Sequence, residues 1–259
     1  MKILKSFAVA FSMYSRIPMP KFDWASEDMK YHLIFFPFVG AVIGFVMYLW
    51  HRASFILPMN GIPFAAIGVI IPIIITGGFH VDGYMDTCDA LSSWGDRKKR
   101  LEILKDSHIG AFSVINLITL GILLFTAIYL MDDKAILTWC FSFVEVRAVS
   151  GLCVVRSKKA KSDGILSTSA RTAQDNIVVA CLAVEFIISN FVAGLYFQWY
   201  CTCSLIALMI AVVYYIYVAY TKFGGITGDL AGWFVCKAEV YMAIAVAICS
   251  MINNPAIAG

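Results

Sequence analysis

Residues 76–111 read TGGFHVDGYMDTCDALSSWGDRKKRLEILKDSHIGA and carry the most concentrated polar chemistry of the chain. Three of the chain's 17 acidic residues, Asp82, Asp86 and Asp89, fall within eight positions here, and Asp96 follows them. Most of the remaining sequence is apolar, and carboxylates placed beside membrane spans are costly unless a function uses them. We therefore expect the rest of the fold to be arranged around this stretch.

The composition of the chain is typical of an integral membrane protein. Of its 259 residues, 61% are hydrophobic and 14% are charged, and the mean hydropathy is +0.81. Soluble domains carry about 25% charged residues. The eight cysteines include no C-x-x-C pair and mostly lie in apolar runs, so we interpret them as free, buried side chains. A single membrane domain covering residues 1–259 is the simplest organisation.

Apolar runs of about 20 residues, long enough to cross a bilayer, predict about seven transmembrane helices. We place them near residues 33–50, 62–79, 109–131, 135–155, 177–197, 201–220 and 239–256. Pro63 and Pro72 predict a kink in the second run. Apolar residues at helical spacing near the N-terminus predict a short helix at the membrane interface. The expected fold class is all-α, a polytopic membrane helix bundle.

Lysine and arginine predict how the chain is oriented. With seven spans, 17 of the 20 basic residues lie on one side, Arg52 and Lys134 lie on the other, and Arg147 lies inside a span. Because basic residues accumulate in cytoplasmic loops, we expect a cytoplasmic N-terminus and an external C-terminus. The aspartates, the basic loop 156–171 and the glycine-rich turn 224–229 would then share the cytoplasmic face.

The spacing of Asp82, Asp86 and Asp89 is i, i+4, i+7, which places three carboxylates on one face of a helix. Carboxylates stacked in this way repel one another unless a cation lies between them. Hard oxygen ligands suit Mg²⁺, which commonly bridges substrate phosphates. The alternative is a solvated acidic loop whose charge is balanced by the basic run 97–100.

Residues around these aspartates could serve phosphate chemistry. His80 could be a base, an acid or a hydrogen-bond donor, and Lys105 could hold a phosphate charge. Asp106 and Ser107 could add metal or phosphate contacts, although each could also be an interfacial cap, and Asp96 is predicted to cap a helix that begins at residue 97. Nearby glycines leave room for the backbone to approach a phosphate; they are Gly77, Gly78 and Gly83.

Two further polar features lie outside this stretch. Glu145 and Arg147 fall inside a predicted span but are two residues apart, so they do not share a helix face and each needs a partner from elsewhere. We expect Arg147 to face the cytoplasmic site. In the glycine-rich turn, Asp229 could be a further metal ligand or a base, with Gly225 and Gly228 beside the substrate. An ordinary turn between spans is the alternative.

Together these motifs resemble the cobalamin synthase family, the membrane adenosylcobinamide-GDP ribazoletransferases. The resemblance covers nearly the whole chain and is carried, in order, by residues 15–20 (SRIPMP), 36–40 (FPFVG), 76–83 (TGGFHVDG) continuing to Asp89, 101–107 (LEILKDS) and 224–229 (GGITGD). The chain departs from the family pattern at Ala90, His108 and Cys236, and in the 156–171 loop.

The resemblance implies that adenosylcobinamide-GDP is joined to α-ribazole, or to its 5′-phosphate, with release of GMP. It implies an Mg²⁺-dependent transfer in a cell membrane, bacterial or archaeal, with the site facing the cytoplasm. The implied metal ligands are Asp82, Asp86, Asp89 and Asp106. His80, Asp82, Lys105, Arg147 and Asp229 would act in catalysis. Besides the substrates, the bilayer is the expected partner; nucleic acid is not, and a homo-oligomer is compatible with the sequence.

Three other classes of membrane protein share some of these features. A CDP-alcohol phosphotransferase also uses stacked aspartates, but this chain lacks the Ala-Arg element of that motif; it remains the alternative. A membrane prenyltransferase needs two aspartate-rich motifs, and the second region here offers only Asp229. A cation channel would need carboxylates at mid-membrane depth, where only Glu145 is expected.

Overall fold

The computed structural model describes the chain except for residues 1, 21–25, 58–60, 107, 161–174 and 255–259. The described residues form helices, and their one β-type pairing is an isolated parallel bridge between Lys159 and Ile226. All eight cysteines are free, as expected, but only four of them are buried and the other four are partly exposed. The predicted all-α class is therefore confirmed.

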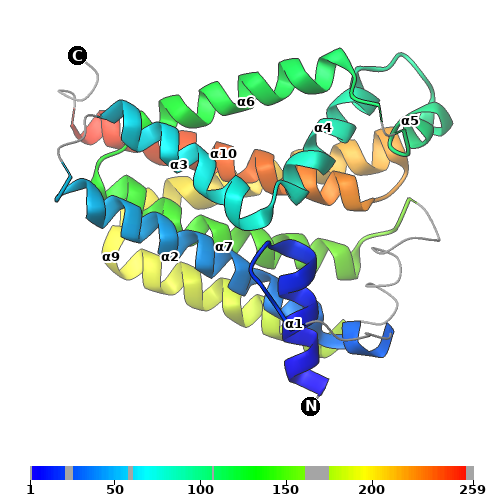
Figure 1. Ribbon diagram of the computed structural model, residues 1–259, viewed down its shortest axis with the longest axis horizontal. Helices are drawn as coiled ribbons and strands as arrows, with labels where there is room; N and C mark the ends of the chain where they lie inside the picture. Colours follow the sequence, from blue (N-terminus) through cyan, green and yellow to red (C-terminus); the bar gives the residue numbers. More distant parts are fainter. Residues whose placement is uncertain (1, 21–25, 58–60, 107, 161–174, 255–259) are drawn as a thin grey trace.

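Long helices run side by side along the long axis of the molecule, and the N-terminal helix lies across them (Figure 1). In chain order the elements are α1 (Lys2–Tyr14), η1 (Ser26–Phe35), α2 (Phe36–Ser54), α3 (Gly61–Thr76), α4 (Phe79–Ser92), α5 (Arg97–Ile103), α6 (Ala111–Tyr129), α7 (Asp133–Arg156), α9 (Asp175–Val218), η2 (Ala219–Phe223) and α10 (Gly228–Asn253).

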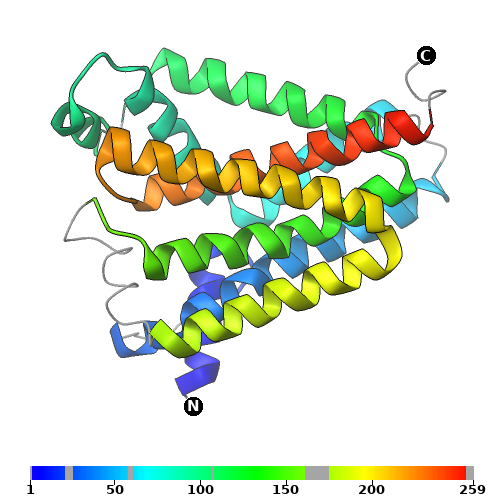
Figure 2. The same cartoon turned by 180° about the vertical axis from the view of Figure 1, so that it is seen from behind.

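The number of membrane-spanning helices differs from the prediction of seven. Five helices of the described chain are long and apolar enough to cross a membrane, or six if the bent pair α3 and α4 forms one span. One span fewer is counted because α3 and α4 are bent apart, and one because two expected spans, 177–197 and 201–220, are joined in α9, a 44-residue element. Phe197 has non-helical backbone angles, and the helix folds back there into two antiparallel arms (Figure 2).

The bend in the second expected span is real, but its position differs from the prediction. Pro72 lies inside α3 without ending it, whereas the axes of α3 and α4 meet at 98° across Gly77 and Gly78. These two glycines have φ angles of 65° and 80°. Only glycine adopts this left-handed region at little cost, so the glycine pair makes the corner.

The last helix begins eleven residues earlier than the sequence indicated. The expected span was 239–256, but α10 starts at Gly228, and the hydroxyl of Thr227 caps it by accepting from Leu230 N at 3.2 Å. Lys237 and Glu239 therefore lie within the helix and not at its mouth. This shift places Glu239 inside the bundle.

The bundle has two ends with different chemistry. At one end, which we call the α5 end, α5 lies close to η2 and to the start of α10 (Figure 1). The Lys159–Ile226 bridge ties the chain after α7 to the same end. At the opposite end, which we call the far end, the turn at Phe197 lies near the start of α7 and the end of α10 (Figure 2).

Candidate active site

Because of the 98° bend between α3 and α4, helix α4 runs toward the α5 end of the bundle. Gly78 is the N-cap of α4, and Asp82 N donates to Gly78 O at 2.9 Å. The N-terminal segment closes the corner from outside: Arg16 N donates to Ile75 O at 2.8 Å, and the Arg16 side chain packs directly on Gly77. A side chain at Gly77 would place its Cβ 2.4 Å from Arg16 Cγ, so the glycine makes this contact possible.

α4 and α10 cross with their backbones almost in contact. A Cβ built on Gly83 would lie 2.9 Å from Asp229 Cα, and one built on Gly232 would lie 3.1 Å from His80 O. Glycine at both positions permits this approach. The crossing brings Asp229, from the glycine-rich turn, against the helix that carries the other aspartates.

Four aspartates at this crossing lie close enough for their charges to interact. The charges of Asp82, Asp229 and Asp89 all act on the Asp86 carboxylate. Asp82 is exposed, whereas Asp86 and Asp229 are half-buried. Residues at least 140 positions apart in the chain therefore come together here, and the role of Asp229 as a metal ligand or base stays a prediction. We call Asp82, Asp86 and Asp229 the carboxylate cluster.

Asp89 has a structural task at the edge of this cluster. Its Oδ2 accepts from Gly110 N at 2.7 Å and its Oδ1 accepts from Ser113 N at 2.9 Å. Gly110 is the N-cap residue of α6 and Ser113 lies in its first turn, where the backbone amides have no partners within the helix. Asp89 thus caps α6 and fixes α6 to α4; its role as a metal ligand stays a prediction.

Asp106 and Lys105 are exposed after the end of α5. The Asp106 carboxylate accepts from His108 N at 3.0 Å and contacts His108 Nδ1 at 2.6 Å, and these hydrogen bonds lower the pKa of Asp106. Ser107 lies outside the described residues. Asp96 caps α5 as predicted, accepting from Lys99 N at 2.9 Å.

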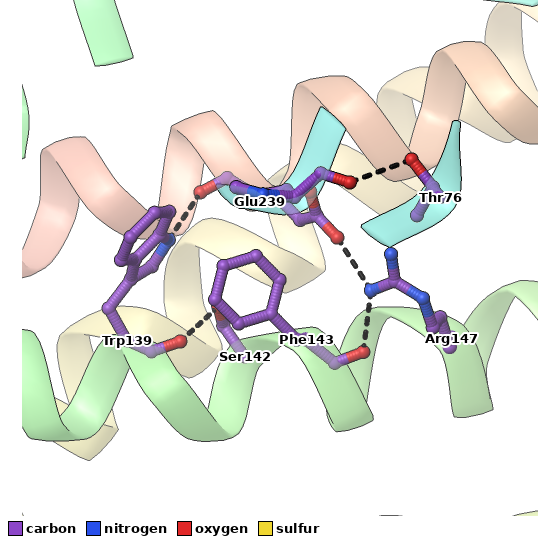
Figure 3. A network of polar contacts seen from close by, with 7 residues as sticks. Thr76, Trp139, Ser142, Phe143, Arg147 and Glu239 are labelled. Atoms are coloured by element: carbon purple, nitrogen blue, oxygen red, sulfur yellow. Dashed lines mark hydrogen bonds and ion pairs between the residues drawn. The ribbon is translucent and has the colours of Figure 1, made fainter. Parts of the chain in front are cut away.

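Arg147 on α7 and Glu239 on α10 form a buried ion pair near Thr76 at the end of α3 (Figure 3). Arg147 is 1% exposed, and its Nη1 donates to Glu239 Oε1 at 2.7 Å and to Phe143 O at 2.9 Å. Trp139 Nε1 donates to Glu239 O at 3.0 Å, which fixes α7 to α10 a second time. The sequence predicted that Arg147 needs a distant partner, but it did not identify Glu239.

His80 lies between this ion pair and the N-terminal helix. Its ring stacks on Tyr14 at 6.4 Å between centroids and packs near Phe36 at 5.6 Å, and the charge of Arg147 acts on it. It is 4% exposed. Neither His80 nor Arg147 is presented to solvent, and their catalytic roles stay predictions.

Glu145 faces the opposite side of α7. It is 2% exposed, and Ser189 Oγ on α9 donates to its Oε1 at 3.4 Å. The expectation that Glu145 and Arg147 point to different partners is confirmed. Glu145 lies apart from the carboxylate cluster and pairs with no cation among the described residues.

The glycines predicted to lie beside the substrate differ in the space around them. Gly78 and Gly228 have no other atom within 4 Å of an added Cβ. Protein atoms fill the space at the other three: Arg16 at Gly77, the Asp229 backbone at Gly83, and the backbone of residues 158–160 at Gly225. Of these five glycines, only Gly78 and Gly228 therefore leave open space beside the backbone.

Hard oxygen donors at the carboxylate cluster match the chemistry of Mg²⁺. Among the described residues, no three His, Cys, Asp or Glu side chains converge closely enough to enclose a metal ion. Mg²⁺ is usually held by one or two carboxylates and completed by water and substrate phosphates. The residues fit this second arrangement, because exposed Asp82 lies beside Asp86 and Asp229.

A cavity of about 790 Å³ lies at the far end, away from the cluster, and its walls include Asp132, Tyr200 and Asn253. Its polar groups bind one another: Tyr200 OH donates to Asp132 Oδ2 at 2.5 Å, and Asn253 Nδ2 donates to Tyr200 OH at 3.1 Å. The network joins the start of α7, the bend in α9 and the end of α10. We interpret it as structural, because the chemistry predicted from the sequence lies at the other end.

The fold and the site define an integral membrane protein with an acidic site where two helices cross at one end of the bundle. A model of the cobalamin-5-phosphate synthase family matches residues 6–247. The chain is 39% identical over 248 residues to the adenosylcobinamide-GDP ribazoletransferase of Lachnoclostridium phytofermentans, which covers 96% of this chain and 95% of that protein. The chain therefore belongs to the cobalamin-5-phosphate synthase family.

Other relatives agree with this assignment. The chain is 30% identical over 251 residues to the adenosylcobinamide-GDP ribazoletransferase of Clostridium perfringens (92% of this chain, 96% of that protein). It is 29% identical over 235 residues to that of Listeria monocytogenes (88% and 92%). No solved structure matches the chain. The predicted family, and with it the predicted enzyme class of ribazoletransferase, is confirmed.

Proposed function

We propose that this chain carries out the reaction for which its relatives are named, in the nucleotide-loop assembly step of cobalamin synthesis. The ribose 3′-oxygen of α-ribazole, or of its 5′-phosphate, attacks the phosphorus attached to cobinamide. The bond from that phosphorus to the GMP oxygen breaks, and the 3′-hydroxyl loses its proton. The observation that carries this proposal is the meeting of Asp82 and Asp86 with Asp229 at the α4–α10 crossing.

In this proposal the carboxylate cluster holds Mg²⁺ together with water and substrate phosphates. The bound cation would neutralise charge on the pyrophosphate and on the departing GMP. Asp82 and Asp86 lie one turn apart on α4, so both can contact one ion. Asp229 approaches from α10 and forms the opposite wall of the site. We assign it as the carboxylate that accepts the hydroxyl proton.

We assign positioning roles to His80 and Arg147. Their burial supports this, since a group that exchanges a proton with substrate must reach it. Arg147 is held by Glu239 and Phe143 O, and the ring of His80 is covered by Tyr14. Together they fix the first turn of α4, from which Asp82 projects. Exposed Lys105 is free to attract the anionic substrate.

We also propose that the α5 end faces the cytoplasm in a cell membrane. Basic residues of the described chain gather at this end, including Arg97, Arg100, Lys158 and Lys222, whereas Arg52 and Lys134 lie at or near the far end. This asymmetry is the one expected for cytoplasmic loops. Every residue assigned here belongs to one chain, so the proposal requires no second copy.

The experiment is product formation by the purified protein in detergent or liposomes. Adenosylcobinamide-GDP is supplied with α-ribazole or its 5′-phosphate, with Mg²⁺ or with EDTA. Mg²⁺-dependent release of GMP together with a cobalamin product is the expected result. Product formation that is equal in EDTA would refute the metal assignment, and no product with either acceptor would refute the reaction.

A further inference from the structure

The basic helix α5 is docked onto the glycine-rich turn that leads to Asp229. The Arg97 guanidinium lies against Gly224, where an added Cβ would be 2.1 Å from Arg97 Cζ and 2.2 Å from Nη1. Gly224 has a φ angle of 73°, and the next residue is held in place because Gly225 N donates to Ala219 O at 2.9 Å. The absence of a side chain at Gly224 therefore creates the position that the guanidinium fills.

Arg97 and Arg100 are three residues apart and so lie on one face of α5, while Lys98 projects elsewhere and is exposed. Arg100 is half-buried on this face, and its Nε is fully buried without a hydrogen-bond partner among the described residues. We call Arg97 and Arg100 the arginine face. Buried polar atoms are nearly always hydrogen-bonded, so such an atom points to a missing acceptor.

The arginine face is not used to neutralise the protein's own carboxylates. Within the described part of the chain, neither arginine pairs with an acidic side chain, whereas the neighbouring Lys99 lies 3.9 Å from Glu102. Asp96 is occupied as the cap of α5. The suggestion that run 97–100 merely balances the aspartates is therefore not what the geometry supports. Both guanidinium charges are therefore without an ion-pair partner in the described part of the chain, and exposed Arg97 can contact an anion from solution.

We propose that the arginine face binds the phosphate of the nucleotide half of the substrate, the part that leaves as GMP. This inference rests on the proposed function for the identity of the nucleotide. A guanidinium presents paired N–H donors that match phosphate oxygens, which a lysine ammonium cannot do. The arginine face lies at the α5 end, against the turn that precedes Asp229. A nucleotide bound there would therefore lie next to the carboxylate cluster and would be accessible from solvent.

The test measures binding of GMP to the full-length protein in detergent, with EDTA present so that neither Mg²⁺ nor turnover is needed. Arg97→Gln and Arg100→Gln should each raise the Kd for GMP on the order of tenfold, because each removes a charge-assisted contact. Lys98→Gln removes the same charge from the same helix and should change the Kd less than about twofold, as expected for a distant exposed charge.

Two further measurements keep the outcomes distinct. Unchanged thermal melting of the variants shows that the fold is intact, and Arg97→Lys, which keeps the charge but not the paired donors, should still weaken binding. Equal GMP affinity in Arg97→Gln, Arg100→Gln and Lys98→Gln would overturn the inference. Because the assay contains no metal, arginine-dependent GMP binding would support it even if Mg²⁺-dependent transfer failed.

Discussion

Glu239→Gln tests whether the Arg147–Glu239 pair holds the bundle around the site. The change keeps the shape of the side chain but leaves the Arg147 charge, 1% exposed, without its 2.7 Å partner. Removing one member of a buried ion pair costs about 3–5 kcal/mol. Since about 1.4 kcal/mol is a factor of ten, the folded-to-unfolded ratio should fall by roughly two to three and a half orders of magnitude.

The assay is unfolding by sodium dodecyl sulfate in mixed micelles, followed by circular dichroism. Glu145→Gln is the matched control, because Glu145 on α7 is buried like Glu239 (2% and 9% exposed) but interacts with Ser189 at 3.4 Å and with no cation among the described residues. It should change the free energy of unfolding by less than about 1 kcal/mol, since no buried charge is left unpaired. Equal effects of the two variants would refute the reasoning.

Three further predictions concern other contacts. Asp89→Ala should lower the free energy of unfolding by about 1–2 kcal/mol because it uncaps α6; a loss of transfer activity at unchanged stability would instead make Asp89 a metal ligand. Gly83→Ala should destabilise by about 1–3 kcal/mol because its Cβ meets the Asp229 backbone at 2.9 Å. Gly121→Ala, in α6, should raise the free energy of unfolding by about 0.5–1 kcal/mol, because no other atom lies within 4 Å of the added Cβ. If melting measurements show that Gly83→Ala and Gly121→Ala change the stability in the same direction, this contrast is wrong. Tyr200→Phe should cost about 1 kcal/mol at the far-end network and leave kcat unchanged, and a large fall in kcat would place the far-end cavity in the reaction.

Local patterns in the sequence predicted the features that depend on local physics. The i, i+4, i+7 spacing placed the aspartates on one helix, and α4 carries them. Asp96 ahead of a basic run predicted a cap, and it accepts from Lys99 N. Hydropathy predicted the helical class, because apolar runs of sufficient length are readable without knowledge of their neighbours.

Features that depend on packing between distant helices were not predictable in the same way. Glu239 was expected at the mouth of a span because the charges of Asp229 and Lys237 interrupt the otherwise apolar first half of α10. Its partner Arg147 lies 92 residues earlier in the chain. A helix boundary taken from the Thr227 cap would have shown that Glu239 lies inside the bundle.

The glycines show the same difference. Their presence near the aspartates predicted close backbone approach, and close approach occurs at Gly83 and Gly225. What approaches there is the chain itself, from α10 and from residues 158–160, which no local pattern identifies. Similarly, the chain bends by 98° between α3 and α4 at Gly77 and Gly78, because both glycines adopt positive φ angles, whereas Pro72 leaves α3 unbroken.

In the proposed reaction, carboxylates from α4 and α10 act together on one Mg²⁺-dependent transfer. The most direct measurement is kcat for GMP release by Asp82→Asn, Asp229→Asn and the double variant, each at saturating Mg²⁺ and with melting temperatures recorded. Residues that act as a unit are strongly non-additive. We predict that each single change lowers kcat by at least about 100-fold, and that the double variant is little worse than either. Wild-type kcat in either single variant, or losses that simply multiply in the double variant, would contradict the account.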